Sequence, residues 1–305
     1  MYLVISDTSA NIDIDVLRER NIHIIPFTYY LNGQDCTCTD TTAFDGAAFY
    51  EAMRNGTRVS TSQIAPQRYI DFFRPFLEEG NDILFIAMSS GLSNSYNSSE
   101  IAASELKEDF PDRKIRLIDA LGASLGEGLL ALKAADFRDD GIPLDEAADC
   151  LLEMRHSMCN MFTVDDLNYL RMTGRLSRIS TTVGSVLNIK PLLKGDTEGK
   201  IVCFHRARGR KKAIAELAAY YDKFVQNPEN QIVGIAHADC EDDAKRLAEL
   251  LNTGKPPKDI MTVMYEPVTG SHVGPGTLAL FFFGDASFRD DRRCSLEQLK
   301  NAIEG

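Results

Sequence analysis

Short runs of apolar, β-branched residues alternate with amphipathic helical stretches along the first half of the chain. We expect strands near residues 2–6, 22–30, 82–88 and 114–119, helices near 13–20, 45–55, 66–79, 95–109 and 124–139, and a further helix from Pro143. Parallel strands need crossover connections, usually helices, which cover the faces of the sheet. This alternation therefore predicts a doubly wound α/β domain, with Asn32-Gly33 as a hairpin turn at the edge of its sheet.

The order of elements changes near residue 160, where we place the boundary between two domains, 1–160 and 161–305. Beyond it we expect helices near 164–172, 180–187, 209–226 and 241–252, and strands near 190–194, 200–205, 231–237, 260–265 and 277–283. This mixture is typical of an α+β domain. The residues after Gly284 are expected to form a solvated C-terminal appendage.

The charge balance excludes several classes of partner. The chain carries 33 lysines and arginines against 45 aspartates and glutamates, a formal net charge of −12. Because this excess repels polyanions, we expect no nucleic-acid partner and no stable membrane insertion. The seven cysteines are scattered and include no C-x-x-C pair, and the first apolar run is too short for a signal peptide. A cytoplasmic location is expected.

The segment 88–99 has the most unusual local composition. It contains six serines and follows the apolar strand expected at 83–87. In open α/β sheets, ligands bind outside the carboxyl ends of the strands, where the first turn of a helix offers free N–H groups. Helix capping needs only one hydroxyl. We therefore interpret this loop as a binding site for a carboxylate or phosphate.

A second polar run, Ser60-Thr61-Ser62, precedes the helix expected from residue 67. Hydroxyl residues before such a helix are ordinary capping residues. We interpret Thr61 and Ser62 as further hydrogen-bond donors only because the serine-rich segment 88–99 is expected to bind the same acidic group of a ligand.

Gly122-Ala123-Ser124-Leu125-Gly126 matches the G-x-S-x-G nucleophile elbow of hydrolases. An esterase would use Ser124 as its nucleophile, with Asp239 and either His237 or His272 as partners. No H-G-G-G motif for an oxyanion hole precedes it, and small residues here also allow close packing of a helix on a sheet. The hydrolase remains the rival hypothesis.

Residues 237–243 gather one histidine, one cysteine and four acids, all of them possible metal ligands. The acids fall where the first turn of a helix favours negative charge. We therefore expect helix capping and no metal site.

Five cations lie within residues 206–212 of this acidic chain: Arg206, Arg208, Arg210, Lys211 and Lys212. Cations near a helix N-terminus oppose its dipole. The cluster is thus a candidate surface for a phosphate or an acidic partner, with a solvated helix start as the alternative.

His272 lies in Gly270-Ser271-His272-Val273-Gly274-Pro275-Gly276, which we interpret as a glycine turn that presents the imidazole. A lone histidine is more often structural than functional, but one held in a rigid turn can donate a hydrogen bond to a bound acid.

Several ordered motifs together resemble the DegV family over about residues 1–284. They are Thr61-Ser62-Gln63, Ser89-Ser90-Gly91-Leu92-Ser93, Ser124-Leu125-Gly126-Glu127-Gly128, the segment 166–177, and His272-Val273-Gly274-Pro275-Gly276. The resemblance implies a Rossmann-like α/β domain and a second α/β domain with a long-chain fatty acid between them. It also implies that Ser124 forms a packing turn rather than a nucleophile elbow.

Family members of this kind serve as the binding subunit of fatty acid kinase, in which a separate ATP-binding protein phosphorylates the bound carboxyl group. The resemblance thus implies a lipid carrier that is not itself an enzyme and has no cofactor of its own, with ATP and Mg²⁺ on the partner kinase. The chain lacks the phosphate-binding motif G-x-x-x-x-G-K-[ST], which agrees with such a partner. A small-molecule kinase on a related fold and a lipid-storage protein stay open.

Carried over by position, the resemblance assigns the fatty-acid carboxylate to Thr61, Ser62, Ser93 and His272. Arg175 would lie near the carboxyl end and Arg208 on the kinase-facing surface. The chain departs from the family pattern at Ile64-Ala65 in place of Pro-Ser, at Ala120 in place of Ser, at Thr173 in place of Gly, and at Asn94 in place of Gly. The larger side chain of Asn94 is expected to reshape the donor loop.

Overall fold

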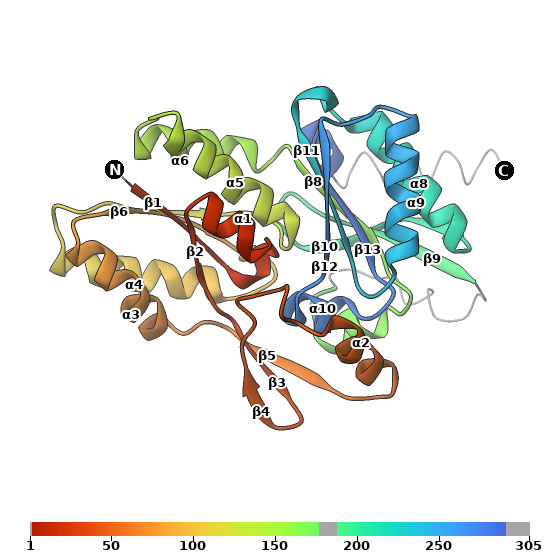
Figure 1. Ribbon diagram of the computed structural model, residues 1–305, viewed down its shortest axis with the longest axis horizontal. Helices are drawn as coiled ribbons and strands as arrows, with labels where there is room; N and C mark the ends of the chain where they lie inside the picture. Colours follow the sequence, from red (N-terminus) through yellow and green to blue (C-terminus); the bar gives the residue numbers. More distant parts are fainter. Residues whose placement is uncertain (1, 177–187, 291–305) are drawn as a thin grey trace. The chain divides into compact units, whose positions relative to one another are not determined.

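The computed structural model describes residues 2–176 and 188–290 (Figure 1). The chain divides into two compact units. We call the residues up to Arg155 together with Glu266–Ser271 the N-terminal unit, and His156–Tyr265 together with the residues from His272 on the C-terminal unit.

A four-stranded parallel sheet forms the centre of the N-terminal unit, in the order β2-β1-β6-β7. The strands are β1 (Tyr2–Asp7), β2 (Ile22–Ile25), β6 (Asp82–Ala87) and β7 (Ile115–Asp119). The chain passes from β1 to β2 on one side and later enters β6 on the other side, so the strand order reverses between β1 and β6. Such a reversal is where doubly wound sheets open a crevice for a ligand.

Helices cover both faces of this sheet. α5 (Leu125–Asp139) and α6 (Leu144–Met154) lie on one face, and α3 (Pro66–Glu78) and α4 (Ser95–Asp109) lie on the other (Figure 1). α1 (Ile14–Glu19) packs against β2, and the 3-10 helix η1 (Thr8–Ala10) follows β1. β6 is buried from Ile83 to Ala87, as its unbroken apolar run requires between two helical layers. The predicted α/β class is confirmed.

A small antiparallel sheet in the order β4-β3-β5 accompanies α2 (Gly46–Arg54). Its strands are β3 (Thr28–Leu31), β4 (Gln34–Cys36) and β5 (Val59–Ser62). Asn32 and Gly33 have φ of 53° and 79°, as the predicted hairpin turn requires. The polar run before α3, expected to be a loop, is an edge strand instead, because half-exposed edge positions accept serine and threonine.

A six-stranded mixed sheet forms the C-terminal unit, in the order β10-β9-β8-β13-β11-β12. Its strands are β8 (Met158–Thr163), β9 (Ile189–Gly195), β10 (Ile201–Arg208), β11 (Ile232–His237), β12 (Asp259–Met264) and β13 (Leu278–Phe283). α8 (Arg210–Phe224) and α9 (Glu241–Thr253) cover one face and bury Phe204, Leu217 and Phe282.

The shorter elements are α7 (Asn168–Met172), α10 (Pro267–Val273), η3 (Pro228–Asn230) and η4 (Ala286–Arg289). β8 was not predicted, since five of its six residues, Met-Cys-Asn-Met-Phe, include no β-branched side chain and only Thr163 has one. The helix expected at 180–187 lies outside the described residues, as do the residues from 291 on. The expectation of a solvated appendage after Gly284 is wrong for residues 285–290, because Phe288 and Arg289 of η4 are buried and Arg289 donates to the carbonyl of Met158 at 2.6 Å.

Across the described ranges, no helix combines the length and the apolar character that crossing a membrane would require.

Candidate functional site

Asp7 ties together the carboxyl ends of β1 and β6, where the strand order reverses. Its Oδ2 accepts a hydrogen bond from the N–H of Met88 at 3.1 Å. Its Oδ1 accepts from the N–H and the hydroxyl of Ser9 at 2.9 and 2.6 Å. The start of the loop that follows β6 is therefore fixed by a buried carboxyl group on β1.

Glu127, in the first turn of α5, is fully buried beside Asp7. Its carboxyl oxygens lie 2.9 Å from the Ser6 hydroxyl and 2.5 Å from the Ser9 hydroxyl. Burial raises the pKa of Glu127 well above its usual value, and the neighbouring charge of Asp7 raises it further.

The number of protons available in this cluster also indicates that Glu127 is protonated. The Ser9 hydroxyl has one proton but contacts two carboxyl groups, so one of these groups must be protonated and donate to it. Asp7 accepts two backbone N–H bonds, which favour its charged form, whereas the recorded contacts of Glu127 are to side-chain groups. We therefore assign the proton to Glu127.

The loop after β7 is hydrogen-bonded to the loop after β6. The N–H of Ser89 donates to the carbonyl of Gly122 at 2.8 Å. The Ser90 hydroxyl donates to Asp119 at 2.6 Å, and Asp119 also accepts from the N–H of Leu121 at 2.9 Å. The serine-rich segment is thus held at the sheet edge by its neighbours in the sheet.

Ser93 is half-buried and is linked to the segment that follows β5. Its Oγ lies 2.9 Å from the Oγ of Ser95, which accepts the N–H of Ile64 at 3.1 Å. The structure therefore links Ile64, two residues after the predicted hydroxyl run at 61–62, to the loop that carries Ser93. Thr61 and Ser62 are half-buried, and Ser62 accepts from the Tyr30 hydroxyl at 3.4 Å.

Asn94 does not distort this loop. Its φ of −78° is ordinary for any residue, and its side chain is exposed and accepts from the amide of Asn97 at 2.7 Å. The position therefore needs no glycine for its own backbone angles.

His272 and Arg175 belong to the C-terminal unit. His272 lies in the last turn of α10 rather than in the expected glycine turn; only Gly274 and Gly276, which follow it, have positive φ. Burial lowers the pKa of His272 to about 4, and the charge of Arg175 contributes in the same direction. The imidazole is therefore neutral near pH 7. Burial also lowers the pKa of Arg175.

The cationic segment 206–212 divides into two parts. Arg210 pairs with Asp243 at 2.7 Å and Lys212 with Glu216 at 2.9 Å, so both cations already have an acidic partner within the chain. Arg206 and Arg208 are exposed on β10, an edge strand of the sheet. Arg208 is thus placed on a surface that a partner can reach.

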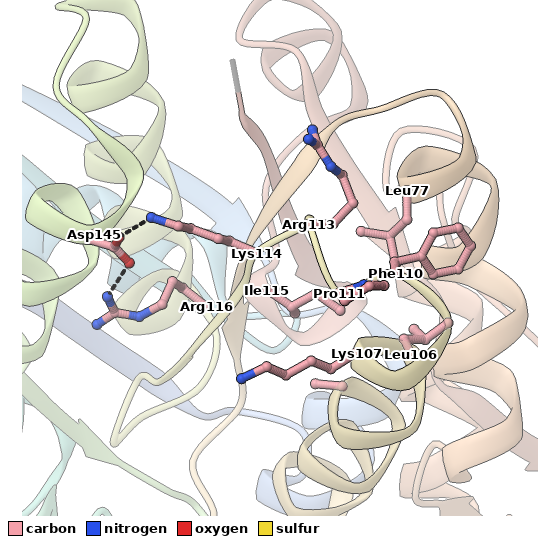
Figure 2. A pocket seen from close by; sticks show the side chains of 11 residues that line it. Leu77, Leu106, Lys107, Phe110, Pro111, Arg113, Lys114, Ile115, Arg116 and Asp145 are labelled. Carbon is pink, nitrogen blue, oxygen red and sulfur yellow. Dashed lines mark hydrogen bonds and ion pairs between the residues drawn. The ribbon is translucent and has the colours of Figure 1, made fainter.

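A surface hollow of about 390 Å³ lies at the other end of the sheet, where β7 begins. Figure 2 shows Lys114 and Arg116 pointing at Asp145, with distances of 2.6 and 2.7 Å. Lys107 and Arg113 line the hollow as well, so its lining has four cations and one acid, although Asp82 and Asp149 also pair with Arg113 and Arg116.

Residues 237–243 match the capping interpretation. His237 accepts the N–H of Cys240 at 3.4 Å, and the acids 241–243 occupy the first turn of α9. Within residues 2–176 and 188–290, no group of three or more His, Cys, Asp or Glu side chains is arranged to hold a metal ion.

Ser124 has the strained backbone of a nucleophile elbow, with φ of 55° and ψ of −145° between β7 and α5. Its hydroxyl is buried and makes no hydrogen bond within the described residues, so no base activates it there. The strand–turn–helix shape that the motif predicts is present, but the proton acceptor that hydrolysis needs is not bonded to it.

Comparison with known proteins decides the family. A model described as "Uncharacterised protein, DegV family" matches residues 1–285. A DegV domain-containing protein of Clostridium perfringens is 37% identical over 284 residues, which cover 93% of this chain and 98% of the relative. The chain belongs to the DegV family.

Two solved DegV structures are similar to this one. A DegV family protein from Thermus thermophilus, described in terms of fatty acid binding, has a TM-score of 0.84 and 26% identity and covers 93% of this chain and 99% of its own. DegV of Bacillus subtilis, described as a fatty acid binding protein, has a TM-score of 0.79 and 28% identity and covers 92% of this chain and 98% of its own.

Sequence reasoning did not single out Asp7, Ser9 or Glu127 for this region, and it included Ser95 only as one of the six serines of the segment 88–99. Asp7 and Ser9 directly follow an apolar strand, which is the signal that revealed the segment after β6. The only sequence signal of Glu127 is its position as an acid in the first turn of a helix, and such a position ordinarily indicates a favourable interaction with the helix dipole.

Replacing Ser124 with Ala is expected to leave ligand binding unchanged and to remove no ester hydrolysis, because its hydroxyl has no partner base. Turnover of p-nitrophenyl esters by the wild type and the variant checks this. If the wild type hydrolyses the esters and the variant does not, the rival hypothesis of a hydrolase with Ser124 as its nucleophile is correct.

Glu127→Gln should flatten the pH dependence of stability. Folded Glu127 keeps a proton that an unfolded glutamate loses near pH 4.5, so the wild type loses stability as the pH rises above that value. Glutamine keeps a donor and an acceptor but does not titrate. Urea unfolding at pH 5 and pH 9 measures the difference.

The exposed Glu105→Gln is the matched control for this prediction and should follow the wild type. An equal loss of stability between pH 5 and pH 9 in wild type and Glu127→Gln would show that Glu127 is not the protonated group.

Proposed function

We propose that this chain binds a long-chain fatty acid and presents its carboxyl group to a separate ATP-dependent kinase for acyl-phosphate formation. The fatty acid binding described for the Thermus and Bacillus relatives supports the first part. The observation that carries the proposal is the hydroxyl-rich region around Ser93, at the carboxyl edge of a doubly wound sheet.

Hydroxyl donors suit a carboxylate that leaves water. A buried carboxylate needs replacement hydrogen bonds, because desolvation without them is costly. Ser93, Thr61 and Ser62 supply such donors from the N-terminal unit. The family resemblance proposes His272 and Arg175 as further carboxylate ligands. Because its imidazole is neutral, His272 can donate one N–H without charge.

A buried apolar face of the sheet in the C-terminal unit suits the acyl chain. Met161, Leu192 and Phe282 point into the core beneath α8 and α9. Since side chains alternate along a strand, their neighbours Phe162, Leu193 and Phe281 point to the opposite face. We propose that this face contacts the acyl chain, whose burial contributes about 0.8 kcal/mol per CH₂ group.

The kinase step requires a second protein in this proposal. The chain has no phosphate-binding G-x-x-x-x-G-K-[ST] motif, and the roles left to it are to bind the acid and to orient one carboxyl oxygen for in-line transfer. ATP and Mg²⁺ belong to the partner. The exposed Arg208 is the proposed contact with it.

Native mass spectrometry of the purified protein, followed by solvent extraction, tests the ligand. A mass increment that extraction identifies as a fatty acid supports the proposal. A phosphorylated small molecule would favour the small-molecule kinase, and a protein that neither carries nor takes up oleate or palmitate would refute fatty acid binding.

Ser93→Ala is expected to weaken fatty acid binding by about 1–3 kcal/mol, because the buried carboxylate loses a donor and keeps its desolvation cost. Displacement of a fluorescent fatty acid measures the change. Ser60→Ala, at an exposed position of β5, is the control and should bind like the wild type. Equal affinity of the Ser93 variant, with an unchanged unfolding midpoint, would remove Ser93 from the site.

Arg208→Ala should leave fatty acid affinity nearly unchanged but slow acyl-phosphate formation with the cognate kinase. A charged rim contact acts mainly on association rate and is screened over a Debye length of about 8–10 Å, so wild-type coupling should also fall as salt rises. Lys212→Ala, whose charge is already paired with Glu216, is the control. Wild-type rates for the Arg208 variant at both low and moderate salt would place the kinase elsewhere.

A further inference from the structure

Ser95 is the first residue of α4, and its side chain is only 1% exposed. Its Oγ accepts the N–H of the buried Ile64 at 3.1 Å and lies 2.9 Å from the Oγ of Ser93. The N–H of Ser95 donates to the same Ser93 oxygen at 3.2 Å. Ser95 therefore contacts the Ser93 hydroxyl through both its backbone and its side chain.

The direction of the contact between the two hydroxyls follows from their single protons. Each hydroxyl donates once and accepts twice. The Ser95 oxygen already accepts from Ile64, and its own buried proton needs an acceptor. Among the residues that the structure describes, the recorded acceptor is the Ser93 oxygen.

Tyr69 is the competing neighbour. Burial raises the pKa of Tyr69 and a hydrogen bond from Ser95 would lower it, but the contact lacks hydrogen-bond geometry: the buried Tyr69 hydroxyl has no partner within hydrogen-bond distance and angle among the described residues. Tyr69 therefore does not take the Ser95 proton. With Ser95 donating, the Ser93 oxygen accepts twice and the Ser93 proton points away from Ser95.

We propose that Ser95 is a positioning residue that makes Ser93 a committed donor to the ligand. The chain of bonds runs from the Ile64 N–H to Ser95, from the Ser95 hydroxyl to Ser93, and from the Ser93 hydroxyl to the carboxylate. Hydrogen bonds in such a chain polarise one another and strengthen the last donor. The final bond rests on the proposed function; the first two are properties of the protein alone.

A double-mutant cycle with palmitate as the probe tests the complete chain. Ser93→Ala should lower affinity about 5- to 150-fold, the range for a lost hydrogen bond to a buried charge. Ser95→Ala should lower it about 3- to 10-fold, and Ser95→Thr, which keeps the hydroxyl, should stay within about twofold of the wild type. If Ser95 acts through Ser93, adding Ser95→Ala to Ser93→Ala should cause no further loss.

Hydrogen exchange of the ligand-free protein tests the first two bonds independently. Ser95→Ala should expose the amide of Ile64, which loses its acceptor, and the amide at position 95, whose acceptor Ser93 becomes free to rotate. Ser95→Thr should keep both amides protected. The unfolding midpoint of each variant shows whether the fold is intact.

The outcomes separate this inference from the proposed function. A wild-type protein that binds no palmitate would overturn the function, and the exchange result would then decide alone whether Ser95 holds the Ser93 oxygen. Losses that add in the double variant would overturn the inference while leaving fatty acid binding intact. Unchanged protection at position 95 in Ser95→Ala would overturn it as well.

Discussion

A buried hydrogen-bonded cluster of Asp7, Ser9 and a protonated Glu127 holds together the carboxyl edge of the sheet in the N-terminal unit. Two carboxyl groups lie in a region without exposed surface, and their contacts are satisfied only if one of them is neutral. The arrangement needs α5 to lie directly against η1. A Cβ atom on Gly128 would come within 2.4 Å of the Ala10 carbonyl oxygen, so only glycine permits this approach.

Further hydrogen bonds connect this cluster to the loop that follows β6. Asp7 fixes the N–H of Met88, Gly122 accepts from Ser89, and Asp119 accepts from Ser90. The loop that carries Ser93 follows β6 and therefore rests on carboxyl and carbonyl groups at the ends of the two strands that flank it, β1 and β7. Buried networks of this kind are rigid when every member is satisfied. A donor mounted on such a base keeps its direction, which is the property that a presenting site for a carboxylate needs.

The parts of the fold that were predicted are those that local patterns determine. The buried runs of β1 and β6, the Asn32-Gly33 turn and the helix from Pro66 all follow from composition and spacing. β5 and β8 were missed because packing in a sheet, not intrinsic preference, makes these segments strands. α10 was missed because Gly270 indicates a turn, whereas in the structure the Tyr50 hydroxyl occupies the space that a side chain there would need.

The candidate site likewise has one part that the sequence predicts and another part that it does not predict. The serine run after β6 is visible in the sequence, because polar residues after an apolar strand mark a carboxyl edge. The bond from Ile64 to Ser95, and the neutral state of Glu127, are not visible there. Both depend on groups that are distant in sequence and meet only after the sheet has formed.

The short return of the chain, residues 266–271, completes the N-terminal unit from the far end of the sequence. The N–H of the buried Glu266 donates to the side chain of Asn11, 255 residues away. A ribosome thus releases almost the whole N-terminal unit long before the piece that completes it. Until residue 271 has emerged, the nascent N-terminal unit lacks the contacts that residues 266–271 make beside η1. Forming these contacts is therefore a late, long-range step in its folding.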